Sequence, residues 1–317
     1  MLSRVAESLM WMSRYLERAN GLARMVEAIE ESSLDHNHPI MSNEEAFWAP
    51  VYDVLDLQEE KLQFIKENNK EQILYNLLLD RTNLTSVASC IAGARYNARG
   101  VRDQIMDEMW ETVNDLHLYC KQINPEQLNA SEFGAKVRFA IHCFRGLVNA
   151  SLEQGEAWSF LILGLRLERA DQISRLLDLK SFMLSKDRQE VGLLEPYVWH
   201  IIAIVSGNKS TGHGMANADW AKMEQFLIFD LVNPASIRHS VRKTNEVLHN
   251  LSGARPGVFT NSAEHVCGKL KADLDYIAFD GLKGIDMHEF LDRIQKELAA
   301  VFVEILETYT HTSDSMS

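Results

Sequence analysis

A short phrase that occurs twice is the sequence feature that most constrains this chain. The first copy is Leu16-Glu17-Arg18-Ala19-Asn20, and the second, 151 residues later, is Leu167-Glu168-Arg169-Ala170-Asp171. Arg24 follows the first copy at the same distance as Arg175 follows the second. Since charged and apolar positions recur together at helical spacing, the repeat predicts that one helix design is used twice.

The scarcity of helix-breaking residues favours an all-helical protein. Proline accounts for 6 of the 317 residues, and the long stretches between Gly or Pro lack the alternation of a β-strand. With 46% hydrophobic and 24% charged residues, a chain of this length can bury a large core. We expect an all-α multi-helix bundle of long amphipathic helices in which residues 1–317 form one domain or two intimately packed halves, 1–154 and 155–317.

Capping and turn residues predict where the helices begin and end. The expected helices cover residues 3–33, a segment to about 68 opened by a Ser42-x-x-Glu45 capping box, one long run from Ser86 to Gln122, and a segment from Ser131 to about 152. The later ones cover 156–184, a short stretch with Pro196 in its first turn, a helix capped by Asn233 and reaching 252, residues 261–279, and 286–310. Residues 206–218, rich in Gly, Ser, Thr and Asn, predict an exposed loop.

Charge and cysteine usage exclude several classes of protein. A net charge of -13 and a pI near 5.3 argue against a nucleic-acid partner. The four cysteines are scattered without C-x-x-C spacing, which is typical of reduced thiols rather than disulfides or a zinc site. Arg4, Glu7 and Arg14 interrupt any signal-peptide core, and no apolar stretch approaches the roughly 20 residues of a membrane helix. We expect a cytoplasmic protein without a membrane span.

The helices that carry the two copies differ in polarity. The first has an apolar face and a wide polar face with Glu7, Arg14 and Arg18, whereas the second is apolar nearly all round. The second helix is therefore expected to be central. Buried charges are costly unless they are paired, so Glu168, Arg169 and Asp171 are expected to pair with charges on neighbouring helices, including those of the first copy.

A second group of charged residues lies between residues 95 and 114. If this run is one helix, Arg95, Arg99 and Arg102 fall on one edge of it, beside an apolar stripe. These guanidinium groups can clamp a carboxylate or phosphate ligand, or they can pair with the acidic residues Glu17, Glu168 and Asp171; we favour the pairing. The candidate cluster is Glu7, Arg14, Glu17, Arg18, Arg95, Asn97, Arg99, Arg102, Asp103, Glu108, Glu111, Glu168, Arg169, Asp171 and Arg175.

Several of these segments together resemble the bacterial Alpha-E family over nearly the whole chain. The segments are Leu2 to Leu9, Trp11 to Ala19, Ala94 to Asp103 with Glu108-x-Trp110-Glu111, and Leu167 to Asp171. The stretch Asn233 to Arg238 is similar to a Pro-Arg-Ser-Val segment of the family, with Ala235 in place of its usual arginine.

The resemblance implies an all-helical cytoplasmic protein encoded beside a circularly permuted ATP-grasp ligase and a transglutaminase-like protein. Such gene neighbourhoods have been interpreted as peptide-synthesis or peptide-modification systems. The family has no established function or catalytic residue, and its name reflects recurrent glutamates. The resemblance assigns these glutamates to Glu7, Glu17, Glu108, Glu111 and Glu168 of this chain.

Three functions remain open from the sequence. We favour a non-catalytic helical partner of the ligase or transglutaminase-like protein, with no cofactor. The alternative is an enzyme or binding protein that uses the Arg/Glu cluster to hold an acidic peptide or a nucleotide. The third, a metal-carboxylate bundle, is ranked last because Glu246-x-x-His249 lacks the second Glu-x-x-His motif that a di-metal bundle requires.

Overall fold

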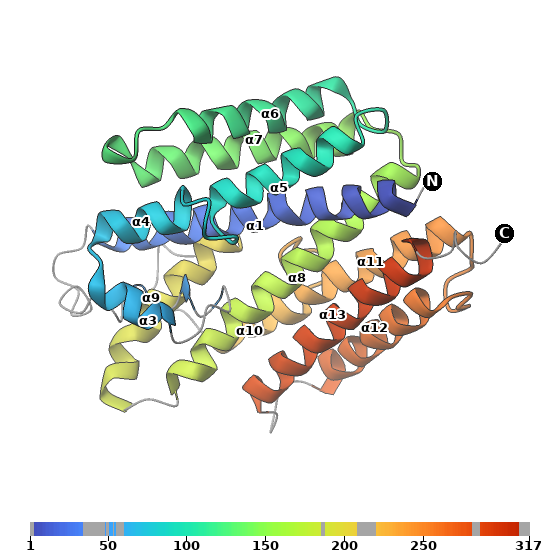
Figure 1. Ribbon diagram of the computed structural model, residues 1–317. Coiled ribbons are helices and arrows are strands. Elements are labelled where there is room, and N and C mark those ends of the chain that lie inside the picture. The colour runs from blue at the N-terminus through green and yellow to red at the C-terminus, as the bar shows by residue number, and fades with distance from the viewer. Residues whose placement is uncertain are drawn as a thin grey trace.

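In the residues that it describes, the structure, a computed structural model, consists of helices joined by turns and loops, which confirms the expected all-α fold class. Those residues are 3–33, 48, 51, 52, 54, 60–184, 188–207, 220–280 and 286–310, and no strand occurs among them. The long helices lie in two groups on either side of a central crossing (Figure 1). Whether the chain is one domain or two packed halves stays a prediction.

The first group gathers around the N-terminal helix and the second around the helix of the second phrase. The first contains α1 (Ser3–Ser33), α4 (Lys70–Leu78), α5 (Val87–Gly100), α6 (Asp107–Gln122), a short 3-10 turn (Pro125–Gln127) and α7 (Ala130–Ala150), and the short helix α3 (Glu60–Glu67) precedes α4 in the chain. The second contains α8 (Glu156–Leu184), α9 (Arg188–Val205), α10 (Trp220–Phe229), α11 (Ile237–Ser252), α12 (Ser262–Asp280) and α13 (Met287–Thr310). Helix α1 packs against α5, α7, α8 and α9, and α8 packs against α1, α11 and α13.

Helix α8 is buried along most of its length, as expected from its nearly uniform apolarity. At Gly164 it approaches α1 so closely that a Cβ would overlap the backbone oxygen of Met10. A glycine here lets the two backbones meet. The apolar residues of α1 and α8 belong to one continuous hydrophobic core that also includes α13.

Helix α1 is largely buried although it has a wide polar face. Among residues 3–32, Arg4 and Glu7 are the exposed ones. The rest of the polar face lies between α1 and its neighbours, where Arg14 and Arg18 face α8. Arg14 and Arg18 of the polar face are therefore used inside the bundle.

The predicted long helix from Ser86 to Gln122 is two helices. Helix α5 ends at Gly100, and α6 begins at Asp107 after a turn. Asp107 and Glu108 in the first turn of α6 suit the positive end of a new helix dipole. Because Arg102 lies in the turn, it does not share a helix edge with Arg95 and Arg99.

Three other local predictions also differ from the structure. Asn129, not Ser131, caps α7, and Ser236, not Asn233, caps α11. The Asn233 side chain instead accepts from the backbone N–H of Ala235, which stabilises the turn before the helix. Pro196 lies inside α9 rather than in its first turn. The Ser42-x-x-Glu45 box and most of the loop predicted over 206–218 lie outside the described residues.

The remaining physical properties concern membranes and thiols. None of the described helices is long and apolar enough to cross a membrane. All four cysteines are free thiols; Cys90, Cys120 and Cys267 are buried, whereas Cys143 is exposed. Burial raises the pKa of Cys90 and Cys267 to about 12, so these thiols stay protonated and serve as small apolar side chains.

Candidate functional site

The two copies of the repeated phrase face each other where α1 crosses α8, and the glutamate of each copy pairs with the arginine of the other. Arg169 of the second copy donates from Nε to Glu17 Oε1 at 2.8 Å. Arg18 of the first copy donates from Nε to Glu168 Oε1 at 2.6 Å and from Nη2 to Oε2 at 3.0 Å. Each glutamate is thus held by the arginine of the other copy, which confirms the expected pairing for Glu168 and Arg169. For Asp171 the expectation is wrong, because its carboxylate pairs with Arg175 of its own helix. We call this set of ion pairs the charged seam.

Each glutamate of the charged seam binds a second arginine. Glu168 also accepts from Nε of Arg14 on α1 at 2.8 Å. Glu17 also accepts from Nη2 of Arg145, which lies on α7. Both carboxylates are shielded from solvent, with side-chain exposures of 2% for Glu168 and 4% for Glu17. The charged seam therefore ties α1 to α8 and, through Arg145, ties both to α7.

The arginines fix the protonation state of both carboxylates. Burial raises the pKa of Glu17, but the charges of Arg145 and Arg169 outweigh that cost and hold the pKa at about 2. For Glu168 burial acts in the same direction, and Arg18 and Arg14 lower its pKa below the ordinary value. A general acid at neutral pH needs a pKa near 7, so neither glutamate has the properties of a proton donor.

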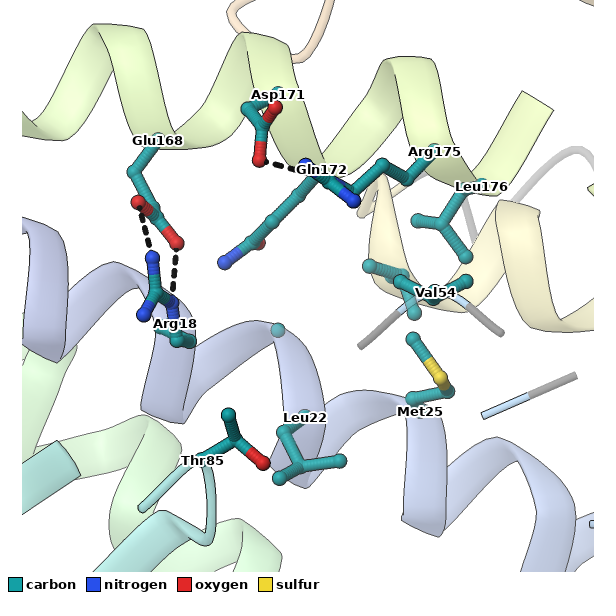
Figure 2. Close-up of a pocket in the computed structure, with 12 residues that line it drawn as sticks. Arg18, Leu22, Met25, Val54, Thr85, Glu168, Asp171, Gln172, Arg175 and Leu176 are labelled. Atoms are coloured by element: carbon teal, nitrogen blue, oxygen red, sulfur yellow. Dashed lines mark hydrogen bonds and ion pairs between the residues drawn. The ribbon is translucent and has the colours of Figure 1, made fainter. Parts of the chain in front are cut away.

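One pocket opens on the Glu168 side of the crossing, and we call it the Glu168 pocket. It has about 660 Å³ of empty space and is lined by Arg18, Gly21, Leu22, Met25, Val54, Thr85, Glu168, Asp171, Gln172, Arg175, Leu176 and Val205. Figure 2 shows Arg18 reaching from α1 to Glu168 on α8, and Asp171 joined to Arg175 along α8. Burial raises the pKa of Asp171 above its ordinary value, although Arg175 lies 3.0 Å away.

A second pocket lies on the Glu17 side, and we call it the Glu17 pocket. It has about 760 Å³ of empty space and is lined by Glu17, Asn20, Gly21, Arg24, Arg145, Arg169, Gln172, Ile173, Val205, Ser206, Gly207, Asn233, Pro234 and Ala235. Gly21, Gln172 and Val205 line both pockets. A Cβ on Gly21 would overlap the Gln172 side chain, so the helices are in close contact between the pockets.

The arginines of the 95–102 segment do not pair with Glu17, Glu168 or Asp171, and that prediction is wrong. Arg95 donates from Nε to Asn114 Oδ1 at 2.9 Å. Arg95 and Arg102 lie over the ring of Trp110, with centroid distances of 5.4 and 4.9 Å. Because α5 ends before Arg102, this part of the chain folds back on its own neighbour α6 instead of on the charged seam.

The other candidates from the sequence divide in the same way. The structure brings Arg14, Glu17, Arg18, Glu168, Arg169, Asp171 and Arg175 together at the crossing. It leaves Glu7, Arg99, Asp103, Glu108 and Glu111 exposed, and it ties Asn97 to the backbone oxygen of Gly93 at 2.8 Å. The recurrent glutamates Glu7, Glu108 and Glu111 are therefore surface residues in this chain.

Several arginines near Glu17 were absent from the candidates predicted from the sequence. Arg145 binds Glu17, and Arg166 donates to the backbone oxygen of Pro234 at 3.3 Å. Arg24 has a visible signal, since it is the counterpart of Arg175 in the repeat. Arg145 has none, because only the packing of α7 against α1 brings it to the site.

The motif considered for a metal site is divided among other contacts. Lys243 donates to Glu246 at 3.1 Å, and His249 Nδ1 lies 4.0 Å from Glu264 Oε2. In the part of the chain that the structure describes, no group of three or more His, Cys, Asp or Glu side chains is arranged to hold a metal ion.

Comparison with known proteins gives one family and several distant relatives. Uncharacterized proteins of Mycobacterium bovis and Mycobacterium tuberculosis are 22% identical to the chain over 271 residues, which is 79% of this chain. The chain spans about 30% of the length of these relatives. No solved structure gives a significant match.

The family match covers residues 1–310 and is described as a predicted alpha-helical domain with a conserved ER motif. The Glu-Arg dipeptide occurs at Glu17-Arg18 and at Glu168-Arg169, which are the pairs that exchange partners in the charged seam. With a family match over almost its whole length, the chain belongs to the Alpha-E family.

Proposed function

We propose that the protein is a non-catalytic helical partner in a cytoplasmic peptide-synthesis or peptide-modification system, and that it docks an ATP-grasp ligase or a transglutaminase-like protein. The observation that carries the proposal is the state of the two Glu-Arg dipeptides. Both glutamates are buried, ionised and fully engaged by arginines, so they fasten helices instead of transferring protons.

The length of the relatives supports a partner role. A region corresponding to this chain makes up about 30% of those proteins, so the helical unit occurs there within a longer polypeptide. A unit that acts with other domains in one polypeptide can act with a separate chain in another. The proposed partners themselves come from the family resemblance.

The exposed segment around the α5–α6 turn is the surface we propose for docking. It carries the charged residues Arg99, Asp103, Glu108 and Glu111, which the charged seam does not use. Charged groups at the rim of an interface steer association and change affinity when they are reversed. Reversal of one of these charges is therefore expected to weaken the complex without unfolding the protein.

The test is binding of the full chain to the ATP-grasp ligase encoded beside it, by titration calorimetry. We expect micromolar or tighter binding, weakened about tenfold by Arg99→Glu and unchanged by Arg242→Glu, a charge reversal on α11 at a side chain that is 42% exposed. Absence of both binding and any effect on ligase activity at micromolar concentration would overturn the partner role. Equal affinities of the two variants would contradict the assigned surface.

The alternative function used the Arg/Glu cluster to hold an acidic peptide or a nucleotide. The arginines predicted to bind such a ligand have other partners. Arg14 and Arg18 are paired with Glu168, and Arg95 and Arg102 pack on Trp110, so this function is not favoured. The metal-carboxylate bundle is tested by elemental analysis of the purified protein. A metal ion present in stoichiometric amount would support it.

A further inference from the structure

The two pockets beside the crossing differ in charge although the same phrase lines both. The Glu168 pocket contains two arginines, Arg18 and Arg175, and two acids, Glu168 and Asp171. The Glu17 pocket contains three arginines, Arg24, Arg145 and Arg169, against the single acid Glu17. The lining of the first is neutral by formal charge, and that of the second carries an excess of two positive charges.

One substitution within the repeat accounts for half of this excess. In the second copy, Arg175 donates from Nε to Asp171 Oδ2, four residues earlier, at 3.0 Å. The equivalent of Asp171 in the first copy is Asn20, which has no carboxylate to offer Arg24. Arg145, contributed by α7, accounts for the rest.

The consequence is a set of buried polar atoms without partners. Arg24 uses Nη1 to donate to the backbone oxygen of Ile204 at 2.9 Å, and its Nη2 lies 3.4 Å from His142 Nε2. Its Nε is buried and has no hydrogen-bond partner among the described residues, and the same holds for Asn233 Nδ2 and Asn20 Oδ1. The Asn20 side chain itself is 5% exposed. Such orphaned groups are rare in folded proteins and call for a partner.

The electrostatics of the site agree with that geometry. Burial lowers the pKa of Arg24, and the charges of Arg138 and Arg169 lower it further. Burial and the charge of Arg169 lower the pKa of Arg166, beside the pocket, to about 10. Burial likewise lowers the pKa of Arg145, against the opposing effect of Glu17. The protein's own carboxylates therefore leave the positive charge here undercompensated.

We propose that the Glu17 pocket is a binding site for a small phosphorylated ligand. Its phosphoryl dianion accepts hydrogen bonds from the Nε of Arg24, from free N–H groups of Arg145 and from the amide of Asn233. A dianion matches the excess of two charges, which a single carboxylate would only halve, and guanidinium groups suit phosphate oxygens. The Asn20 carbonyl then accepts from a hydroxyl of the ligand.

This site goes beyond the proposed docking role and uses different residues. Its walls come from α1, α7, α8, the end of α9 and the turn before α11. A ligand there would contact the segments that the charged seam joins, and it would stabilise the folded protein by mass action.

The experiment is titration calorimetry of the full chain with inorganic phosphate, with sodium chloride added to keep the ionic strength constant. We expect one saturable site. Asn20→Asp is isosteric and places beside Arg24 the carboxylate that Arg175 already has, so it should weaken phosphate binding about tenfold or more. Arg24→Gln should have a similar effect. The matched control, Arg175→Gln, changes the equivalent arginine of the other pocket and should leave the affinity within about twofold.

Melting temperatures without phosphate show whether each variant is folded, and Asn233→Ala, a change without charge, is the second route if Arg24→Gln does not fold. It should weaken binding about threefold. Absence of saturable binding up to about 10 mM phosphate overturns the proposal. So does equal loss in Arg24→Gln and Arg175→Gln. Tighter binding of a hexaglutamate peptide than of phosphate, with the same dependence on Arg24, overturns the phosphoryl assignment in favour of carboxylates.

Discussion

The Glu17 and Glu168 sides of the α1/α8 crossing begin from the same short sequence and arrive at different electrostatics. Glu168 receives both of its arginines, Arg14 and Arg18, from the single helix α1. Glu17 receives one from α8 and one from α7, through Arg169 and Arg145. The repeated phrase thus dictates the exchange between the copies, and the surrounding helices dictate what else each glutamate holds.

The ion pairs of Glu168 therefore join two helices, α1 and α8, whereas those of Glu17 join three, α1, α7 and α8. Removal of Glu168 leaves Arg14 and Arg18, which lie on one helix, without a counter-charge. Removal of Glu17 leaves Arg145 and Arg169 facing each other across two helices, with Arg166 nearby. Like charges in a buried place repel, so the two sides should respond unequally to the same mutation.

The largest expected effect is therefore on stability. Glu168→Ala should lower the free energy of unfolding by about 3–5 kcal/mol, because it leaves buried arginines without a counter-charge. Glu17→Ala should reach the upper end of that range or exceed it, since it affects three helices. Urea unfolding followed by circular dichroism measures both values. An equal loss in the two variants, or a larger one in Glu168→Ala, would show that the surroundings do not distinguish the two sides.

The second expected effect is a loss of stability in acid. The folded pKa of Glu17 is about 2 and its ordinary value is 4.5, so its contribution is present above pH 4.5 and is lost as the pH falls toward 2. Linkage over that interval amounts to about 3 kcal/mol. The pKa of Glu168 is also lowered and acts in the same direction. Chemical denaturation at a series of pH values measures how the free energy of unfolding depends on pH. This dependence should be weaker in Glu17→Gln, and the same dependence as in the unmodified protein would contradict the pairing.

Local sequence patterns predicted the two helices and the ion pairs between them, but they did not predict the full set of residues at the site. The spacing of the phrase and the apolar surroundings of its second copy were enough to place α8 centrally and to pair Glu168 with the first copy. The turn after Gly100 was missed because the apolar stripe continues across it. Because of that error, Arg102 was predicted to lie on the same helix as Arg95 and Arg99, although α5 ends before it.

The Glu17 pocket shows where prediction from local sequence stops. Arg145 and Asn233 reach the pocket only because α7 and the turn before α11 pack beside α1 and α8. No periodicity within either segment encodes that neighbour. The Asn20 and Asp171 difference was visible in the sequence, but its meaning depends on Arg24 being buried beside other arginines.

The smallest expected effect sharpens the comparison at this repeat position. Burial raises the folded pKa of Asp171, so its ionised form disfavours the folded state, and this penalty grows as the pH rises through that pKa. Asp171→Asn removes the penalty and gives the second copy the residue type of the first. The lost link to Arg175 counts for little, because that arginine is 30% exposed and lies on the same helix. We expect the free energy of unfolding at pH 7 to rise by between zero and about 1 kcal/mol. A loss of more than about 1 kcal/mol in urea unfolding would mean that the Asp171–Arg175 pair fastens the Glu168 side as Glu17 fastens the other.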